Sequence, residues 1–142
     1  MSKTEIPQRL RRKVAEQAKH RCGYCLTQER IIGTEMEVDH IIPEALEGKT
    51  EEANLWLACE RCNKYKGERI QAPDPETNES VLLFHPRQQR WADHFAWSPE
   101  GDHIIGLTPT GRATIMALKL NREKLVQARK LWVNAGWHPP QD

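Results

Sequence analysis

The chain has 142 residues, a formal net charge of +1 and a pI of about 7.7. This length predicts one domain, and the balanced charge does not single out a nucleic-acid binder, because such domains often have a pI above about 9. No stretch approaches the roughly 18 apolar residues of a membrane-spanning helix, and no signal peptide is recognisable near the start. We therefore expect a cytoplasmic protein without a membrane segment.

Residues 1–21 form a basic N-terminal segment, in which seven Lys or Arg residues face two Glu residues. Apolar side chains recur at the spacing of one helix face within residues 8–20, so this segment predicts a helix that leads to the first cysteine. The basic side chains are interpreted either as the solvated face of this helix or as contacts to DNA phosphates, with Arg11 and Arg12 as candidates.

Four cysteines form two identical pairs, Cys22-Gly-Tyr-Cys25 and Cys59-Glu-Arg-Cys62. In a reducing compartment such pairs favour metal binding over disulfides, and four thiolates suit a structural, tetrahedral Zn²⁺. An ordinary zinc ribbon separates its two pairs by about 15 to 20 residues. Here 33 residues, positions 26–58, lie between them. The interval therefore contains additional structure.

The pattern in that interval predicts strand, loop, strand and helix. Residues 36–42 are rich in β-branched side chains and end at Pro43, which cannot continue a paired strand. A polar, acidic loop follows, and residues 54–58 form a second short strand that leads into Cys59. Residues 60–68 favour a helix that ends near Gly67. The two strands form a hairpin with a long connection.

The C-terminal half predicts a further mixture of strands and helices. Residues 71–80 are polar and turn-rich, whereas residues 92–97 and 103–107 flank a turn and predict a hairpin. Two helices follow over residues 112–120 and 122–135. For the second helix we expect Asn121 as N-cap and a buried apolar face formed by Leu125, Ala128, Leu131, Trp132 and Ala135. The tryptophans of this half are interpreted as packing residues rather than base-stacking residues.

Four polar residues stand at the ends of these core elements: Asp39, His40, Asn54 and Asn63. Together with the cysteine pairs they resemble the HNH endonucleases of the zinc-bound, restriction-like type. The residues that carry this resemblance lie within about residues 20–67 and are Cys22, Cys25, Asp39-His40-Ile41-Ile42-Pro43, Asn54-Leu55, Cys59, Cys62-Asn63 and Lys66-Gly67. The segment from Leu83 to Arg122 is similar to the C-terminal extension of small stand-alone bacterial HNH proteins.

The resemblance implies an α+β fold with a ββα-metal core. The core, residues 22–68, is expected to be held by the zinc site of the four cysteines and preceded by the N-terminal helix. Residues 69–142 are expected to form an α+β extension, a hairpin plus helices, that packs on the core within a single domain 1–142. The family position of Asp39 and that of Asn63 often hold histidine instead.

The resemblance also implies the role of each polar residue. Asp39 and Asn63 would hold one divalent ion, and their hard oxygen ligands favour Mg²⁺ or Mn²⁺ over zinc. His40 suits a general base because its unperturbed pKa lies near neutrality. Asn54 matches the family position that orients the histidine. The predicted reaction is hydrolysis of a DNA phosphodiester that leaves 5′-phosphate and 3′-hydroxyl ends.

Several basic residues are candidates for contacts to DNA phosphates. Arg61, Lys64 and Lys66 lie on the predicted core helix, although short basic helices are usually only solvated. His94 is treated as structural, unless the extension folds back over the site and delivers it. Arg87 is interpreted either as a clamp for a phosphate or as an ordinary surface charge. The alternatives to a nuclease are a zinc-ribbon-like module that binds nucleic acid or protein without cleaving, and a hydrolase of RNA or another phosphoester.

Overall fold

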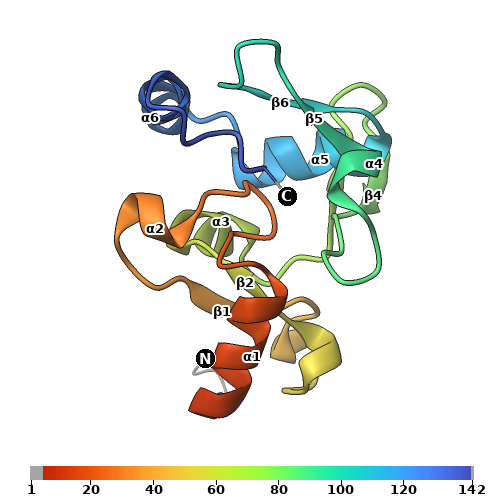
Figure 1. The fold of residues 1–142 in the computed structure, drawn as a ribbon. Coiled ribbons are helices and arrows are strands. Elements are labelled where there is room, and N and C mark those ends of the chain that lie inside the picture. The colour runs from red at the N-terminus through yellow and green to blue at the C-terminus, as the bar shows by residue number, and fades with distance from the viewer. Residues whose placement is uncertain (1–4, 142) are drawn as a thin grey trace. The chain divides into compact units, whose positions relative to one another are not determined.

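The computed structural model describes residues 5–141, which fall into two compact units. The first unit runs to Ile70 and includes His85–Gln88, and the second comprises Gln71–Phe84 and the residues from Gln89 on. Each unit combines helices with short antiparallel strands, which confirms the predicted α+β class (Figure 1). The first four residues of the predicted basic segment lie outside the described residues. That the whole chain forms one domain stays a prediction.

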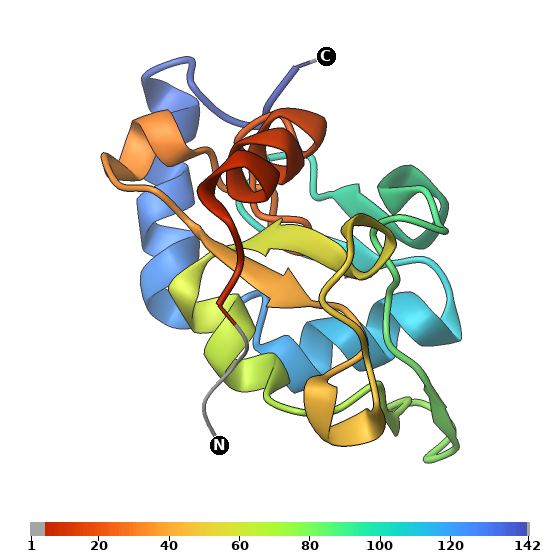
Figure 2. The same cartoon turned by 90° about the horizontal axis from the view of Figure 1, so that it is seen from below.

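The first unit contains the predicted ββα core. Its elements are α1 (Gln8–Gln17), α2 (Glu29–Ile32), β1 (Glu37–His40), the 3-10 helices η1 (Glu44–Leu46) and η2 (Glu52–Asn54), β2 (Leu55–Ala58) and α3 (Glu60–Lys66). β1 and β2 pair antiparallel, with Asp39 opposite Trp56 and His40 opposite Leu55. Both α1 and α3 contact this hairpin, which lies between them in Figures 1 and 2. The N-terminal helix and the hairpin-plus-helix core are therefore confirmed.

The local sequence explains where these elements end. Pro43 follows β1 and provides no N–H for further pairing. The connection to β2 then passes so close to the strand end that a Cβ at Gly48 would lie 1.7 Å from the Ile42 carbonyl oxygen. α1 ends at Gln17, earlier than predicted, because Lys19 and His20 adopt left-handed φ values of 56° and 57°.

Up to residue 141, the second unit contains two hairpins and three helices. Its elements are β3 (Gln71–Pro73), β4 (Ser80–Leu82), α4 (Trp91–His94), β5 (Phe95–Trp97), β6 (Ile104–Gly106), α5 (Pro109–Leu118) and α6 (Glu123–Asn134). β5 pairs with β6 as predicted, and β3 pairs with β4 where the sequence indicated only a polar loop. The N-cap of α5 is Thr108, whose hydroxyl accepts a hydrogen bond from the Gly111 N–H at 3.0 Å.

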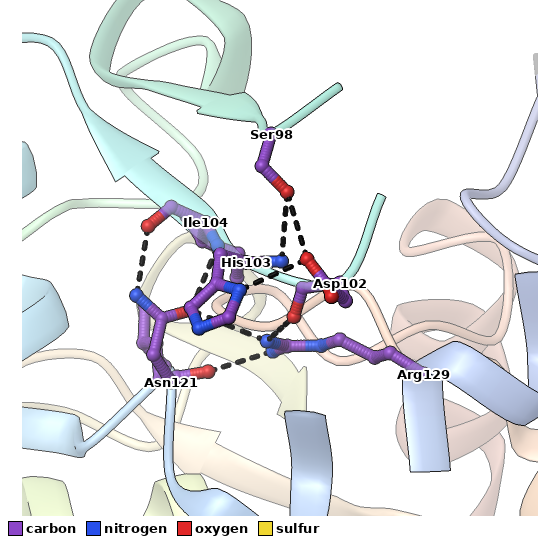
Figure 3. Close-up of polar contacts among 7 residues, drawn as sticks. Ser98, Asp102, His103, Ile104, Asn121 and Arg129 are labelled. Atoms are coloured by element: carbon purple, nitrogen blue, oxygen red, sulfur yellow. Dashed lines mark hydrogen bonds and ion pairs between the residues drawn. The ribbon is translucent and has the colours of Figure 1, made fainter. Parts of the chain in front are cut away.

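The environment predicted for α6 is wrong in two respects. Its N-cap is Arg122 and not Asn121, whose side chain instead pairs with the backbone of Ile104 (Figure 3). On the helix, Leu131 is 70% exposed, whereas Arg129 is fully buried. The buried face is therefore centred on a charged residue that the apolar pattern did not include.

Arg129 is held by backbone and side-chain oxygens of the second unit. Its guanidinium donates to the carbonyl oxygen of Asp102 at 3.1 Å and to Oδ1 of Asn121 at 3.3 Å (Figure 3). It also donates to the carbonyl oxygen of Leu120 at 2.7 Å. It also lies 5.3 Å from the ring centroid of Trp97. These contacts offset the cost of burying a charge, so we interpret Arg129 as structural.

A serine, an aspartate and a histidine also meet in Figure 3 without forming a catalytic triad. The Ser98 hydroxyl donates to Asp102 Oδ1 at 3.0 Å, and His103 Nδ1 lies 2.9 Å from the same oxygen. The serine is thus bonded to the carboxylate and not to the imidazole, whereas a nucleophile must contact its base. This cluster closes the turn between β5 and β6.

Candidate functional site

The four cysteines form one buried cluster in the first unit. Their sulfur atoms all lie within 4.8 Å of one another, and the Sγ atoms of Cys25 and Cys59 are 3.8 Å apart. A tetrahedral zinc ion with Zn–S bonds of about 2.3 Å requires sulfurs about 3.8 Å apart. The cluster therefore fits a metal ion of this type, and the predicted pairing of the two C-x2-C turns is confirmed.

Backbone geometry explains why these turns converge. In the first turn, the Leu26 N–H donates to the Cys22 carbonyl at 3.0 Å, and Leu26 takes a left-handed φ of 58°. The Gly23 N–H donates to Leu57 of β2 at 2.8 Å, which attaches the turn to the hairpin. In the second turn, Cys59 is the N-cap of α3, and its sulfur accepts from the Cys62 N–H at 3.4 Å. Thus the cluster joins the first turn, the hairpin and α3.

The thiols of this cluster influence one another's protonation. Burial raises the pKa of Cys22, whereas hydrogen bonds from Cys22 and Cys59 hold the pKa of Cys25 well below its usual range. A metal ion binds cysteine as the thiolate, so binding of an ion to this cluster would release the protons of its thiols.

Asp39 lies on the side of β1 that faces α3, and it is paired with a lysine. The Asp39 and Lys66 side chains are only 3% and 2% exposed, and Oδ2 of Asp39 lies 3.0 Å from Nζ of Lys66. The Tyr24 hydroxyl donates to the same oxygen at 3.5 Å. Burial and the charge of Asp39 raise the pKa of Tyr24, so this hydroxyl stays protonated and acts as a donor. The sequence did not predict this ion pair.

Asn63 makes a second contact between α3 and β1. Its amide nitrogen donates to Oε1 of Glu37 at 2.5 Å. Residues 37 and 39 share one side of a strand, and residues 63 and 66 share one side of a helix. The Asn63–Glu37 and Lys66–Asp39 contacts are therefore neighbours. The structure places the two predicted ion ligands, Asp39 and Asn63, on facing elements. It also brings the Glu37 carboxylate to Asn63, and the sequence could have indicated this because residues 37 and 39 lie on the same side of a strand.

His40 ends β1 and is only 2% exposed. Its Nε2 lies 2.8 Å from the Thr50 hydroxyl oxygen and 3.6 Å from Oε1 of Glu44. Both partners belong to the connection between β1 and β2, for which the sequence predicted only a loop. They fix the orientation of the imidazole, and no local pattern in the sequence indicated either of them.

Asn54 holds the backbone next to His40 rather than its ring. Its Oδ1 accepts from the Ile42 N–H, and its Nδ2 donates to the carbonyl oxygens of Ile42 and Lys49, each at 2.9 Å. These three bonds join the end of β1 to the connection that follows it. These contacts of Asn54 are therefore with the backbone near His40 and not with the imidazole.

The predicted DNA-contacting residues have different surroundings. Arg61 and Lys64 of α3 and Arg12 of α1 are exposed at the surface. Arg11 is half-buried and donates to the Ile6 carbonyl oxygen at 3.1 Å. Lys66, in contrast, is buried in its pair with Asp39, so its ammonium group does not lie on the surface.

His85–Gln88 return to the first unit and support the hairpin. Arg87 donates through Nε to the Leu55 carbonyl oxygen at 2.9 Å, and its guanidinium lies 4.9 Å from the Trp56 ring centroid. Burial lowers the pKa of His85, and its Nδ1 accepts the Gln88 N–H at 3.2 Å. His94 belongs to the second unit, where Nδ1 lies 2.7 Å from the Thr108 hydroxyl oxygen.

Comparison with known proteins identifies the segment that contains this site. Residues 22–69 match the family model of the HNH endonucleases. The match includes both cysteine pairs, β1, β2 and α3, and thus all four polar residues singled out above. The resemblance to HNH endonucleases is therefore confirmed, and residues 22–69 carry an HNH nuclease-family domain.

One relative extends the similarity beyond this domain. The Septu protein PtuB of Bacillus mycoides (strain KBAB4) is 27% identical over 137 residues, a region that covers 77% of this chain and 45% of the relative. The chain thus spans less than half the length of that protein. No solved structure matches the chain significantly. Among residues 5–141, no helix has the length and apolar character needed to cross a membrane.

Proposed function

We propose that this chain, whose residues 22–69 match the HNH endonucleases, is a metal-dependent endonuclease that hydrolyses DNA phosphodiester bonds. The observation that carries the proposal is the arrangement around α3. Asp39 and His40 end a strand that the cysteine cluster joins to this helix, and Asn63 faces the same strand. A binding module has no need for a buried histidine next to a carboxylate.

In the proposed reaction His40 is the general base. It takes a proton from a water molecule, whose oxygen attacks the phosphorus while the bond from phosphorus to the 3′ oxygen breaks. The products are a 5′-phosphate and, after protonation of the leaving oxygen, a 3′-hydroxyl. Thr50 and Glu44 orient the His40 ring, and Asn54 fixes the backbone beside it. A positioned general base typically contributes about 10²- to 10⁴-fold to the rate.

Two kinds of metal ion are proposed. The four cysteines hold a structural Zn²⁺, for which their sulfur spacing is suitable. Asp39 and Asn63 hold Mg²⁺ or Mn²⁺, which would stabilise negative charge on the scissile phosphate when bound. Four reduced thiols fit a reducing compartment, so we place the reaction in the cytoplasm.

DNA is proposed to approach the accessible side chains of α3 and α1. Arg61, Lys64 and Arg12 offer charge to the phosphate backbone, with a smaller part for the half-buried Arg11. Such contacts position the duplex but do not read sequence. Affinity for DNA should therefore fall steeply as the salt concentration rises.

Incubation of the purified protein with supercoiled plasmid tests the proposal. The reaction is run with Mg²⁺, with Mn²⁺ and without added divalent ion, and a structured RNA is tested in parallel. We expect nicking or linearisation of the plasmid only when an ion is added, with little cleavage of RNA. Cleavage of RNA alone would replace the DNA substrate with RNA. Absence of cleavage with every ion would contradict the nuclease.

A non-catalytic zinc module is the second candidate, and one observation favours it. Asp39 is already neutralised by Lys66, as in a carboxylate with a purely structural role. Binding of a labelled DNA duplex distinguishes the two. Salt-sensitive binding without cleavage under any ion condition supports the module, whereas ion-dependent cleavage excludes it.

A further inference from the structure

Lys66 places its charge inside the proposed active site. It stands at the end of α3 and is 2% exposed. Its Nζ lies 3.0 Å from Asp39 Oδ2 and donates to the His40 carbonyl oxygen at 3.1 Å. A single ammonium group therefore contacts two residues to which the proposed reaction assigns chemistry.

A buried carboxylate requires a compensating positive charge. Removing one partner of a buried ion pair is strongly destabilising, whereas replacing both partners by neutral groups is often tolerated. Lys66 provides that charge for Asp39. A divalent ion bound to Asp39 would provide it too, and two cations close to one carboxylate repel each other.

We propose that Lys66 is a positioning residue that serves as the internal counter-ion of Asp39. It keeps the carboxylate facing α3, and a divalent ion binds Asp39 by displacing the ammonium group. This inference rests on the proposed function, because it takes Asp39 as an ion ligand. It also explains how an ion-binding carboxylate is tolerated at 3% exposure.

The inference predicts that Lys66 lowers the affinity of the protein for divalent ions. Lys66→Met keeps the apolar stem of the side chain, one atom shorter, and removes its charge. We expect Lys66→Met to bind Mn²⁺ at least about tenfold more tightly than wild type, equal to about 1.4 kcal/mol. A purely packing role of Lys66 would leave the Mn²⁺ affinity unchanged.

Binding of Mn²⁺ in the absence of DNA tests the prediction. The free ion is followed by its electron paramagnetic resonance signal for wild type, Lys66→Met, Asp39→Asn and the double variant. Lys130→Met, which alters an exposed lysine of α6 in the second unit, is the matched control. Each protein is first shown to contain one equivalent of zinc.

The outcomes separate this inference from the proposed function. Tighter binding by Lys66→Met alone, lost again in the double variant, supports the counter-ion role. Equal affinity of wild type and Lys66→Met, with loss in Asp39→Asn, overturns the counter-ion role but keeps the ion site. No Mn²⁺ binding by wild type or Lys66→Met overturns both.

If Lys66→Met folds poorly, thermal unfolding with and without Mn²⁺ still tests the inference. The expected result is that Mn²⁺ raises the melting temperature of Lys66→Met more than that of wild type, because the ion replaces the missing charge. If Lys66→Met stays unfolded at every Mn²⁺ concentration while the double variant folds, the ion cannot replace the ammonium group, and the inference is overturned.

Discussion

The two units use the same asparagine contact in different surroundings. In the first unit, Asn54 pairs with both backbone groups of Ile42, with N···O distances of 2.9 Å. In the second unit, Asn121 pairs with both backbone groups of Ile104 at 2.7 and 2.8 Å (Figure 3). Each side-chain amide pairs with the N–H and the carbonyl of one residue, as the backbone of a neighbouring strand does. The side-chain hydrogen bonds of the two asparagines therefore do not distinguish a residue of an active site from a residue that only supports the fold.

The neighbours of each asparagine make the difference. Asn54 fixes the backbone two residues after His40, in a unit joined by four cysteines. Asn121 fixes β6 and accepts a hydrogen bond from the buried Arg129. An identical contact therefore supports a proposed active site in one unit and only the fold in the other.

Loss of the cysteine cluster should have the largest effect on the first unit. Cys62→Ser removes one of four buried sulfurs, and structural zinc sites contribute roughly 10 to 16 kcal/mol of apparent binding free energy. We expect that the variant no longer binds one equivalent of zinc. We also expect that its Ile42 amide exchanges hydrogen faster than in wild type. Exchange measured by mass spectrometry checks this. Loss of zinc with an Ile42 amide that stays protected would show that the cluster does not support the Asn54 contact.

Arg129 should be the corresponding support of the second unit. Arg129→Met removes hydrogen bonds to Asp102, Leu120 and Asn121 and leaves buried acceptors unsatisfied. We expect a loss of about 3 kcal/mol in the free energy of unfolding. Urea unfolding followed by tryptophan fluorescence measures it, because four of the five tryptophans belong to this unit. A loss below about 1 kcal/mol would contradict this role.

The two asparagine variants compare the contacts directly. Asn54→Ala and Asn121→Ala each leave a backbone N–H and a carbonyl of one isoleucine without their side-chain partner. We expect each to lower the free energy of unfolding by about 2 kcal/mol. Only Asn54→Ala should also slow plasmid cleavage, because only Asn54 adjoins His40.

Cleavage by the asparagine variants is measured at a temperature at which circular dichroism shows both to be folded. Asn121→Ala is thus the control for loss of stability alone. Equal slowing of cleavage by both variants would mean that stability, and not the position of His40, accounts for the effect of Asn54.

The contact between Asp74 and Arg112 should make a smaller, pH-dependent contribution to the stability of the second unit. Hydrogen bonds from Arg112 lower the pKa of Asp74 to about 2 from 3.8. Because the folded-state pKa is the lower one, this stabilisation is present above about pH 4 and is lost as the pH falls through about 2. Thermal unfolding between about pH 5 and pH 2 should show this decline. Arg112→Met should remove it, and an unchanged decline would assign it to other groups.

The core was predictable because its signals are local in the sequence. The cysteine spacing, Pro43 after a β-branched run, and Asn63 after the last cysteine each follow from adjacent residues. Together they placed β1, β2 and α3 in order. In the same way, the paired strands β5 and β6 followed from two β-rich stretches around a turn.

Long-range polar pairs were not predictable. Lys66 and Asp39 are 27 positions apart, and nothing near either residue indicates the other. Asn121 has the residue type and position of a helix cap, yet the backbone of Ile104 offers its side chain two hydrogen bonds in place of one. The prediction of the buried face of α6 was wrong because it assumed that only apolar side chains are buried. Arg129 is buried nevertheless, because its guanidinium is hydrogen-bonded.

The most direct test of the proposed nuclease is the rate of plasmid nicking by wild type, His40→Ala and His103→Ala with saturating Mg²⁺. His103 is half exposed and lies in the second unit, which makes it a matched histidine control. With zinc content and folding equal, we predict the wild-type rate for His103→Ala and a rate at least about 100-fold lower for His40→Ala. Nicking by His40→Ala at the wild-type rate would contradict the assignment of His40 as the general base.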